Sequence, residues 1–127
     1  HDLYQDLIHL RRNWFDNTRG LRGQHINVFH VNNDDKLIAY HRWEHGGPGD
    51  DVIVILNFAD RTYDSYAIGF PQEGTWWTRF NSDWQGYDAY FGNVGGYTTT
   101  ASWGGKDGMP CSGNVGIAPY SALILSQ

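Results

Sequence analysis

Five aspartates are the residues of this chain best suited to acid–base chemistry. They lie in polar segments that we expect to form turns: Asp34, Asp35, Asp50, Asp51 and Asp60. Cleavage of a glycosidic bond needs two carboxyl groups about 5 to 9 Å apart across the sugar, one of them with a raised pKa. Turn aspartates are instead well solvated and hydrogen-bond to the nearby backbone in Asx turns. We therefore expect these carboxylates to shape turns, and we predict no catalytic residue in the chain.

Four histidines raise the possibility of a metal site: His25, His30, His41 and His45. Residues four apart on one strand are separated by about 13 Å, so His41 and His45 cannot bind one ion from the same strand. A hairpin turn centred on residues 33–34 would also keep His30 and His41 apart. It would place His30 opposite Leu37, and it would place His41 opposite Ile26. We therefore interpret these histidines as residues of a surface or a sheet face, and we predict no metal ion.

The segment Gly104–Asp107 imitates the end of a phosphate-binding loop but lacks two required residues. Thr100 stands where that loop needs glycine, and Asp107 stands where a serine or threonine would bind magnesium. Cys111 follows a proline with no base beside it, so we expect a small loop residue rather than a nucleophile. Ser121 has no triad signature around it. We predict no cofactor for this chain.

The tryptophans leave two interpretations open. Trp76 and Trp77 are adjacent, so on a strand they point to opposite faces of the sheet. Trp84, Tyr87 and Tyr90 follow closely in the sequence. Exposed aromatic rings rimmed by hydrogen-bonding groups suit carbohydrate faces, which makes Trp76, Trp77 and Trp84 candidate substrate-binding residues. The other interpretation is packing in the core or against another domain, because aromatic residues dominate both environments.

The chain begins inside an amphipathic helix that we expect to end near Asn13. Leu3, Leu7 and Leu10 are spaced to line one face of it. A helix this short is marginal in water unless it packs on something. The helix has no start methionine and no leader before it, and we therefore interpret the chain as a piece of a larger protein.

Short strands joined by tight turns are expected over most of the remaining sequence. Val52–Leu56 is continuously apolar and too short for a helix, which predicts a central strand buried on both faces. Residues 85–113 are rich in glycine with weak periodicity, and we expect a long irregular segment there with at most one short strand. The other expected strands cover residues 24–31, 36–43, 63–70, 75–80 and 122–125. This pattern predicts an all-β fold: a Greek-key-like antiparallel β-sandwich of about seven or eight strands with a short N-terminal helix.

Composition excludes several classes of protein. The 127 residues are 40% hydrophobic and 16% aromatic, enough to build a core in one domain. A formal net charge of −5 argues against a nucleic-acid partner, because phosphate binding needs clustered Lys and Arg. No segment has the length of a membrane span, and the single Cys111 excludes an internal disulfide. These features are compatible with a cytoplasmic location.

Several motifs, taken in order, resemble a known family. The helix segment Leu7–Arg12 is similar to the last barrel helix of α-amylase superfamily (glycoside hydrolase family 13) enzymes. The following segments resemble the C-terminal all-β domain of these enzymes, especially in the style of glucan branching enzymes: 38–43, 52–58, 66–71, 74–76, 80–83 and 118–123. One departure is Ala118, where relatives often have a second proline, and residues 92–113 match no motif of the family.

The resemblance implies a fold and a role. Residues 1–13 would be a helix left over from the end of a catalytic barrel, and residues 14–127 would form the C-terminal β-sandwich. The parent enzyme would act on α-1,4/α-1,6-glucans, as an α-amylase or a branching enzyme, with its catalytic residues on the absent barrel. We expect a non-catalytic accessory domain that stabilises this barrel, its partner in the same polypeptide.

Two other functions stay open. The first is a carbohydrate-binding module that holds an α-glucan chain through exposed tryptophans. The second is an autonomous enzyme or an unrelated binding protein with a sandwich fold.

Overall fold

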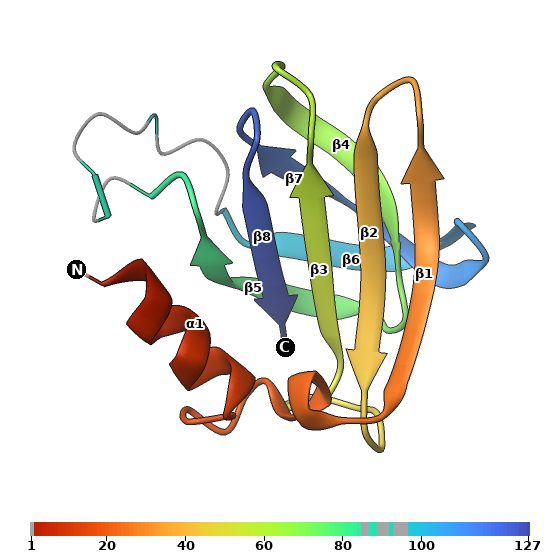
Figure 1. Ribbon diagram of the computed structural model, residues 1–127. Helices are drawn as coiled ribbons and strands as arrows, with labels where there is room; N and C mark the ends of the chain where they lie inside the picture. Colours follow the sequence, from red (N-terminus) through yellow and green to blue (C-terminus); the bar gives the residue numbers. More distant parts are fainter. Residues whose placement is uncertain (1, 85–86, 89–91, 93–96) are drawn as a thin grey trace.

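The computed structural model describes residues 2–84, 87–88, 92 and 97–127. These residues form one α-helix, one 3-10 helix and eight strands (Figure 1). The elements are α1 (Leu3–Arg11), η1 (Arg19–Arg22), β1 (His25–Asn32), β2 (Leu37–Trp43), β3 (Val52–Asn57), β4 (Tyr63–Phe70), β5 (Gly74–Asn81), β6 (Thr99–Lys106), β7 (Met109–Ile117) and β8 (Ala122–Ser126). A membrane-crossing helix needs about 20 apolar residues, and no helix in the described part of the chain meets that requirement.

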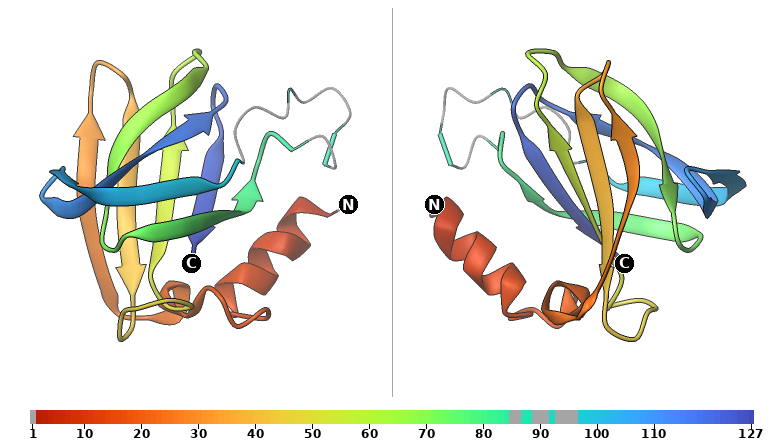
Figure 2. Two further views of the ribbon diagram at one scale, coloured as in Figure 1. Left: turned by 180° about the vertical axis from the view of Figure 1, so that it is seen from behind. Right: turned by 45° about the vertical axis from the view of Figure 1, so that its right-hand side comes forward.

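The strands pair in the order β1-β2-β3-β8-β5-β6-β7-β4, and every neighbouring pair is antiparallel. β5 belongs to two layers, because residues 77–81 pair with β8 and residues 74–76 pair with β6. The layer of β1, β2, β3 and β8 lies in front of the layer of β4, β6 and β7, whose strands run across it (Figures 1 and 2). The predicted antiparallel all-β sandwich is confirmed.

The main core lies between these two layers. Alternate residues of the front layer, such as Ala39, Ile53 and Leu125, meet the inward side chains of the back layer. Trp76 is fully buried there, with its ring 5.2 Å from that of Phe70 and its indole N–H donating to the Gln72 carbonyl at 3.1 Å. The indole therefore fills the core without leaving its polar atom unpaired.

A second apolar cluster covers the outer face of the front layer. Leu10 of α1 and Leu21 of η1 are buried against Val54 and Ile124, and Leu3 and Leu7 pack at the margin of this cluster. Asp2 caps the N-terminus of the helix, and its carboxylate accepts hydrogen bonds from the backbone N–H groups of residues 4 and 5. Strand β3 therefore has an apolar layer on each side, which confirms the prediction of a central strand buried on both faces.

The Gly-rich region is where the strand prediction is wrong. In place of one long irregular segment to residue 113, β6 and β7 form a hairpin that contributes to the back layer. A Cβ atom on Gly113 would lie 2.9 Å from Thr99 Cγ2, and one on Gly116 would lie 2.6 Å from Tyr97 Cε1. These glycines thus permit a close approach to neighbouring residues within a strand.

Substitution of Gly113 tests this close approach. Gly113→Ala should lower the free energy of unfolding by about 1–3 kcal/mol, because the added methyl group overpacks a site already in contact with Thr99 and Phe70. Chemical denaturation measures the change. Gly108→Asn is the matched control, since Gly108 has open space around it and asparagine tolerates its left-handed φ of 78°. Equal midpoints for both variants would contradict this reading of β7.

Candidate functional site

Asp50 is a buried structural residue, which makes the prediction of solvated turn aspartates wrong at this position. Its side chain has no exposed surface. Its oxygens accept hydrogen bonds from the backbone N–H groups of residues 44–46 at 2.8 to 3.1 Å and from Arg19 Nε at 2.6 Å. Burial alone would raise the pKa of Asp50, but these bonds outweigh it and lower the pKa from 3.8 to about 2. Asp50 therefore holds the β2–β3 loop against the connection from α1.

Asp51 is buried next to Asp50, so the prediction of a solvated turn aspartate is also wrong for Asp51. Its Oδ1 lies 2.8 Å from His41 Nε2, and its Oδ2 accepts from the Gly47 backbone at 2.8 Å. His41 in turn stacks on Trp43, with ring centroids 4.4 Å apart. Burial and saturation of these oxygens leave Asp51 in a structural role. By contrast, Asp34 and Asp60 are exposed, as expected of turn residues.

The histidines are distributed as separate structural contacts. His30 pairs with Ala39 and His41 pairs with Asn27, so the predicted partners Leu37 and Ile26 are wrong. The turn runs one residue further than expected, through Lys36 at a φ of 59°, and a bulge lies between residues 28 and 30. Among the described residues, no group of three or more His, Cys, Asp or Glu side chains could hold a metal ion.

One histidine joins the two layers at their open edge. His30 lies between Asp107 Oδ1 at 3.1 Å and the Tyr66 hydroxyl at 2.9 Å, and Tyr66 donates to Asp35 Oδ2 at 2.7 Å. Burial, together with Asp35, raises the pKa of Tyr66, so the phenol remains a donor. Asp107 also accepts from the Gly69 backbone at 3.1 Å. Asp107, at the end of the segment that resembles a phosphate loop, therefore links the β6–β7 turn to β1 and β4 through hydrogen bonds.

The two remaining nucleophile candidates are buried. Cys111 lies in strand β7 within the main core, which corrects the expectation of a loop residue. Burial, with a smaller effect of Glu73, raises the pKa of its thiol, and a thiol held neutral in a core is a poor nucleophile. The Ser121 hydroxyl donates to the Ala118 carbonyl at 2.7 Å.

The three candidate tryptophans occupy different environments. Trp76 points into the core and Trp77 points outward with 50% of its surface exposed, so the predicted opposite orientations are confirmed. Trp84 is 41% exposed and packs edge-on against Tyr87, with ring centroids 5.1 Å apart. Of the three, Trp77 and Trp84 reach solvent. Tyr90 lies outside the described residues.

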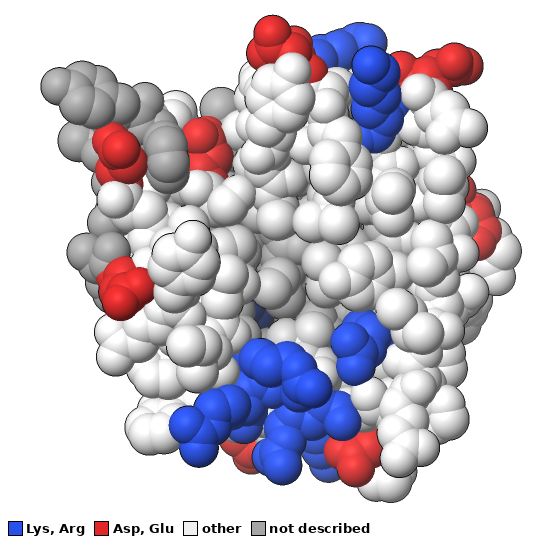
Figure 3. Space-filling view, viewed as in Figure 1, with Lys and Arg blue, Asp and Glu red and all other residues white. Residues whose placement is uncertain are grey.

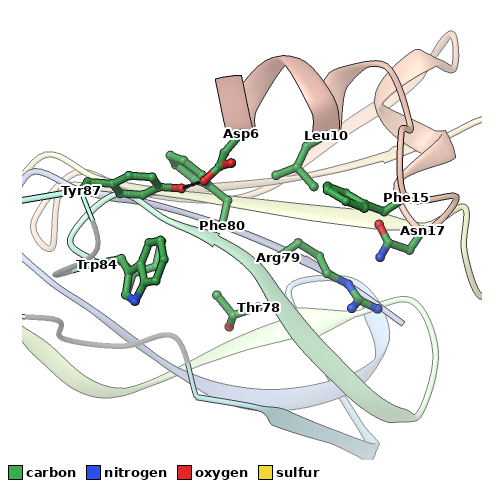
Figure 4. Close-up of a pocket in the computed structure, with 10 residues that line it drawn as sticks. Asp6, Leu10, Phe15, Asn17, Thr78, Arg79, Phe80, Trp84 and Tyr87 are labelled. Carbon is green, nitrogen blue, oxygen red and sulfur yellow. Dashed lines mark hydrogen bonds between the residues drawn. The ribbon is translucent and has the colours of Figure 1, made fainter. Parts of the chain in front are cut away.

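Trp84 borders a hollow of about 410 Å³ between α1 and β5 (Figure 4). Residues 78–81 form one wall, and the other wall contains Asp6, Leu10, Phe15 and Asn17. The Tyr87 hydroxyl donates to Asp6 Oδ2 at 2.6 Å across one end, and burial, with Asp6, raises the pKa of Tyr87. No sequence pattern indicates this hollow, because it joins the first turns of the chain to a strand about 70 residues later.

A second surface feature is an apolar face on the front layer. In β1, Ile26 and Val28 pair with Arg42 and Tyr40, and Tyr40 packs against the outer cluster. Because paired residues share a face, Ile26 and Val28 also point outward, where they are about half exposed. Tyr4 and Ile8 of α1 are also exposed. Figure 3 shows the front layer from outside, where Lys and Arg gather at the lower end and the centre carries little charge.

The chain matches the sequence model described as "Alpha amylase, C-terminal all-beta domain" over residues 28–127. This chain belongs to that family. The match begins in β1, so α1 and η1 lie outside it. The family assignment agrees with the resemblance found in the ordered motifs.

Curated relatives of this family member include proteins named "1,4-alpha-glucan branching enzyme GlgB". The one from Dechloromonas aromatica is 31% identical over 97 residues, covering 74% of this chain and 15% of the relative. The one from Mycobacterium ulcerans is 36% identical over 83 residues, covering 64% and 11%. The one from Nitrosococcus oceani is 34% identical over 83 residues, covering 61% and 10%. The chain thus spans only a small part of the length of the relatives it matches.

The Asp50 cluster should make stability fall in acid. Because the folded pKa of Asp50 is depressed to about 2, its contribution is complete above pH 3.8 and is lost as the pH falls toward 2. The lowering corresponds to about 2 kcal/mol in the free energy of unfolding. Urea denaturation of the wild type and Asp50→Asn between pH 6 and pH 2 measures this quantity. The difference between the two proteins should shrink toward pH 2, and parallel profiles would contradict the assignment.

Proposed function

We propose that this chain is a non-catalytic C-terminal accessory domain of an α-amylase superfamily enzyme that acts on α-1,4/α-1,6-glucans, and that it stabilises the catalytic barrel. The parent enzyme is a glycoside hydrolase or a glucan branching transferase. Membership of the C-terminal domain family and the similarity to branching enzymes support this proposal. The single observation that carries the stabilising role is the exposed apolar side of α1, formed by Tyr4 and Ile8.

The helix supports a division of the chain into residues 1–13, from the end of a barrel, and residues 14–127, the sandwich. Leu3, Leu7 and Leu10 face the sheet, whereas Tyr4 and Ile8 project from the helix with 76% and 54% of their surfaces exposed. Apolar residues on a second side of a helix favour packing against a second surface. The barrel that would precede it in the polypeptide is such a partner.

A second exposed apolar surface lies on the outer side of β1. It contains Ile26 and Val28, and Val31 is also exposed nearby. Single exposed hydrophobic residues are common on any protein, but a contiguous apolar patch marks an interaction surface. Three exposed arginines lie in the connection between α1 and β1, namely Arg11, Arg12 and Arg22. The barrel surface that docks here is therefore expected to be apolar with an acidic margin.

Substitutions on this face test the proposal in the full-length protein. Ile8→Glu introduces a better helix former than isoleucine, and Ile26→Thr keeps a β-branched residue, so both domains should fold. Each variant should shorten the half-life of glucan-modifying activity at elevated temperature, since lost burial costs about 1–3 kcal/mol per side chain. Assays of residual activity against heating time give the half-lives.

Trp103 provides the matched control. It is 69% exposed on β6 in the back layer, and Trp103→Thr should leave the half-life unchanged because that surface is outside the proposed contact. Unaltered half-lives for both Ile8→Glu and Ile26→Thr would overturn the stabilising role.

A second function, the holding of an α-glucan chain through exposed tryptophans, is favoured by the position of Trp77. Its ring projects from β5 beside a fully buried neighbour, so it adds no packing to the main core. Aromatic side chains half exposed in this way offer a flat apolar surface with a polar N–H. Trp76 supports such a site only from within the core, by holding β5 in place.

Retention by glycogen tests this second function. Trp77→Ala should migrate faster than the wild-type full-length protein in native gels that contain glycogen, because one stacking surface is lost. Trp103→Ala serves as the control and should keep the wild-type retention. Identical migration of all three proteins would remove Trp77 from the proposal. The cytoplasmic location expected from the sequence stays a prediction.

A further inference from the structure

We propose that the hollow between α1 and β5 is a binding subsite for one or two glucose units of an α-1,4-glucan chain. This inference rests on the proposed function for the class of sugar, and it adds a defined site to it. The hollow has about 410 Å³, within the roughly 300–1,000 Å³ typical of small-molecule sites. It lies along residues 78–81 of β5, where the edge opposite β8 pairs with no strand among the described residues.

The walls of the hollow combine aromatic rings with a few polar groups. Trp84 stands at one end and the exposed ring of Phe15 lies on the opposite side, so both offer surfaces for the C–H face of a sugar ring (Figure 4). The edge-on contact with Tyr87, whose hydroxyl is bonded to Asp6, holds the Trp84 indole in place. A ring positioned before the ligand arrives loses little conformational entropy on binding.

Asn17 supplies an acceptor to the hollow. Its Oδ1 atom is buried and has no hydrogen-bond partner in the described part of the chain. A buried acceptor left unpaired is unfavourable, so a ligand hydroxyl that donates to it would recover the lost hydrogen bond. Asn17 follows the helix and lines the hollow opposite β5.

Arg79 supplies donors from the other wall. Its Nε donates to Ser126 Oγ at 2.9 Å, and one terminal nitrogen donates to the Gln127 carbonyl at 3.3 Å. These bonds fix the guanidinium and use two of its five N–H groups. Burial lowers the pKa of Arg79, which reflects partial removal of its head group from water. The remaining N–H groups can donate to sugar hydroxyl oxygens.

The charges of the lining favour a neutral ligand over an anion. Asp6 and Arg79 are its only charged residues among those described, and they have opposite signs. A phosphate site would instead be expected to gather several positive groups. Hydroxyl groups both donate and accept, and they therefore match the Asn17 acceptor and the Arg79 donors together.

The hollow and the proposed barrel contact occupy different flanks of α1. Residues advance by about 100° around a helix, so Asp6 and Leu10 lie on one flank of the buried stripe while Tyr4 and Ile8 lie on the other. A barrel docked on Tyr4 and Ile8 would leave the β5 side open. A glucan bound there would be tethered close to the enzyme that acts on it, which raises its effective concentration at the active site.

Fluorine NMR of the full-length protein labelled with 5-fluorotryptophan tests the subsite directly. The resonance absent from Trp84→Phe identifies Trp84. Titration with maltotriose should move this resonance saturably in the millimolar range, and cellotriose and inorganic phosphate should not move it. Arg79→Gln should raise the dissociation constant about tenfold, as expected for a lost charge-assisted hydrogen bond. Asn17→Ala should also weaken binding.

The Trp76 and Trp103 resonances are internal controls. An unchanged Trp76 resonance in the Arg79 and Asn17 variants shows that the core is native, and a stationary Trp103 resonance shows that the response is local. No saturable shift of Trp84 with maltotriose would overturn the subsite, whether the hollow is empty or filled by a barrel side chain. A response to phosphate alone would also overturn it. If Trp84 stays still while Ile8→Glu and Ile26→Thr shorten the half-life, the stabilising role stands and this subsite fails.

Discussion

Strands β3 and β8 are buried on both faces, and the positions of α1 and of the outer apolar cluster follow from this burial. A strand in a two-layer sandwich usually has one face toward the core and one toward water. Here Val52, Val54 and Ile124 place apolar side chains on the outer face as well. That face needs a cover, and α1 provides it through Leu10 with Leu3 and Leu7 at the margin. The helix has nine residues and would be marginal alone, so the helix and the sheet stabilise each other.

The width of one helix explains both surface features of the domain. A helix is about 10–12 Å across and strands are about 4.8 Å apart, so α1 covers about two strands. The outer side of β1 is left uncovered on one flank, where Ile26 and Val28 are exposed. The free edge of β5 is left on the other flank, where the hollow forms. The proposed docking face and the proposed sugar subsite are therefore two consequences of one packing geometry, and each can exist without the other.

The polar clusters around Asp50 and His30 link separate segments of the chain at the end and the edge of the sandwich. Asp50 joins the β2–β3 loop to Arg19 ahead of β1, and His30 joins the front layer to Asp107 of the back layer. The donors to Asp50 come from its own loop and from Arg19, whereas the partners of Asp107 come from β1 and β4. Their oxygens are occupied by structural bonds.

Local patterns predicted a large part of the fold and little of the site. The hairpin of β1 and β2 followed from alternating strands around a polar turn, and the opposite orientations of Trp76 and Trp77 followed from the two-residue period of a strand. The hairpin of β6 and β7 was missed because glycine usually breaks strands, and only the proximity of Thr99 and Tyr97 shows why glycine is needed there. The predicted position of the β1–β2 turn is wrong by one residue, because Lys36 adopts a left-handed conformation that its residue type does not indicate.

Periodicity and the order of motifs are enough to establish the class of fold, the amphipathic helix, the doubly buried strand and the family. Which carboxylates are buried, which tryptophans reach solvent, and that Asn17, Arg79 and Trp84 border one hollow become known only from the folded chain. These properties depend on contacts between segments far apart in the chain, and burial and hydrogen-bond partners are set by those contacts and not by residue type.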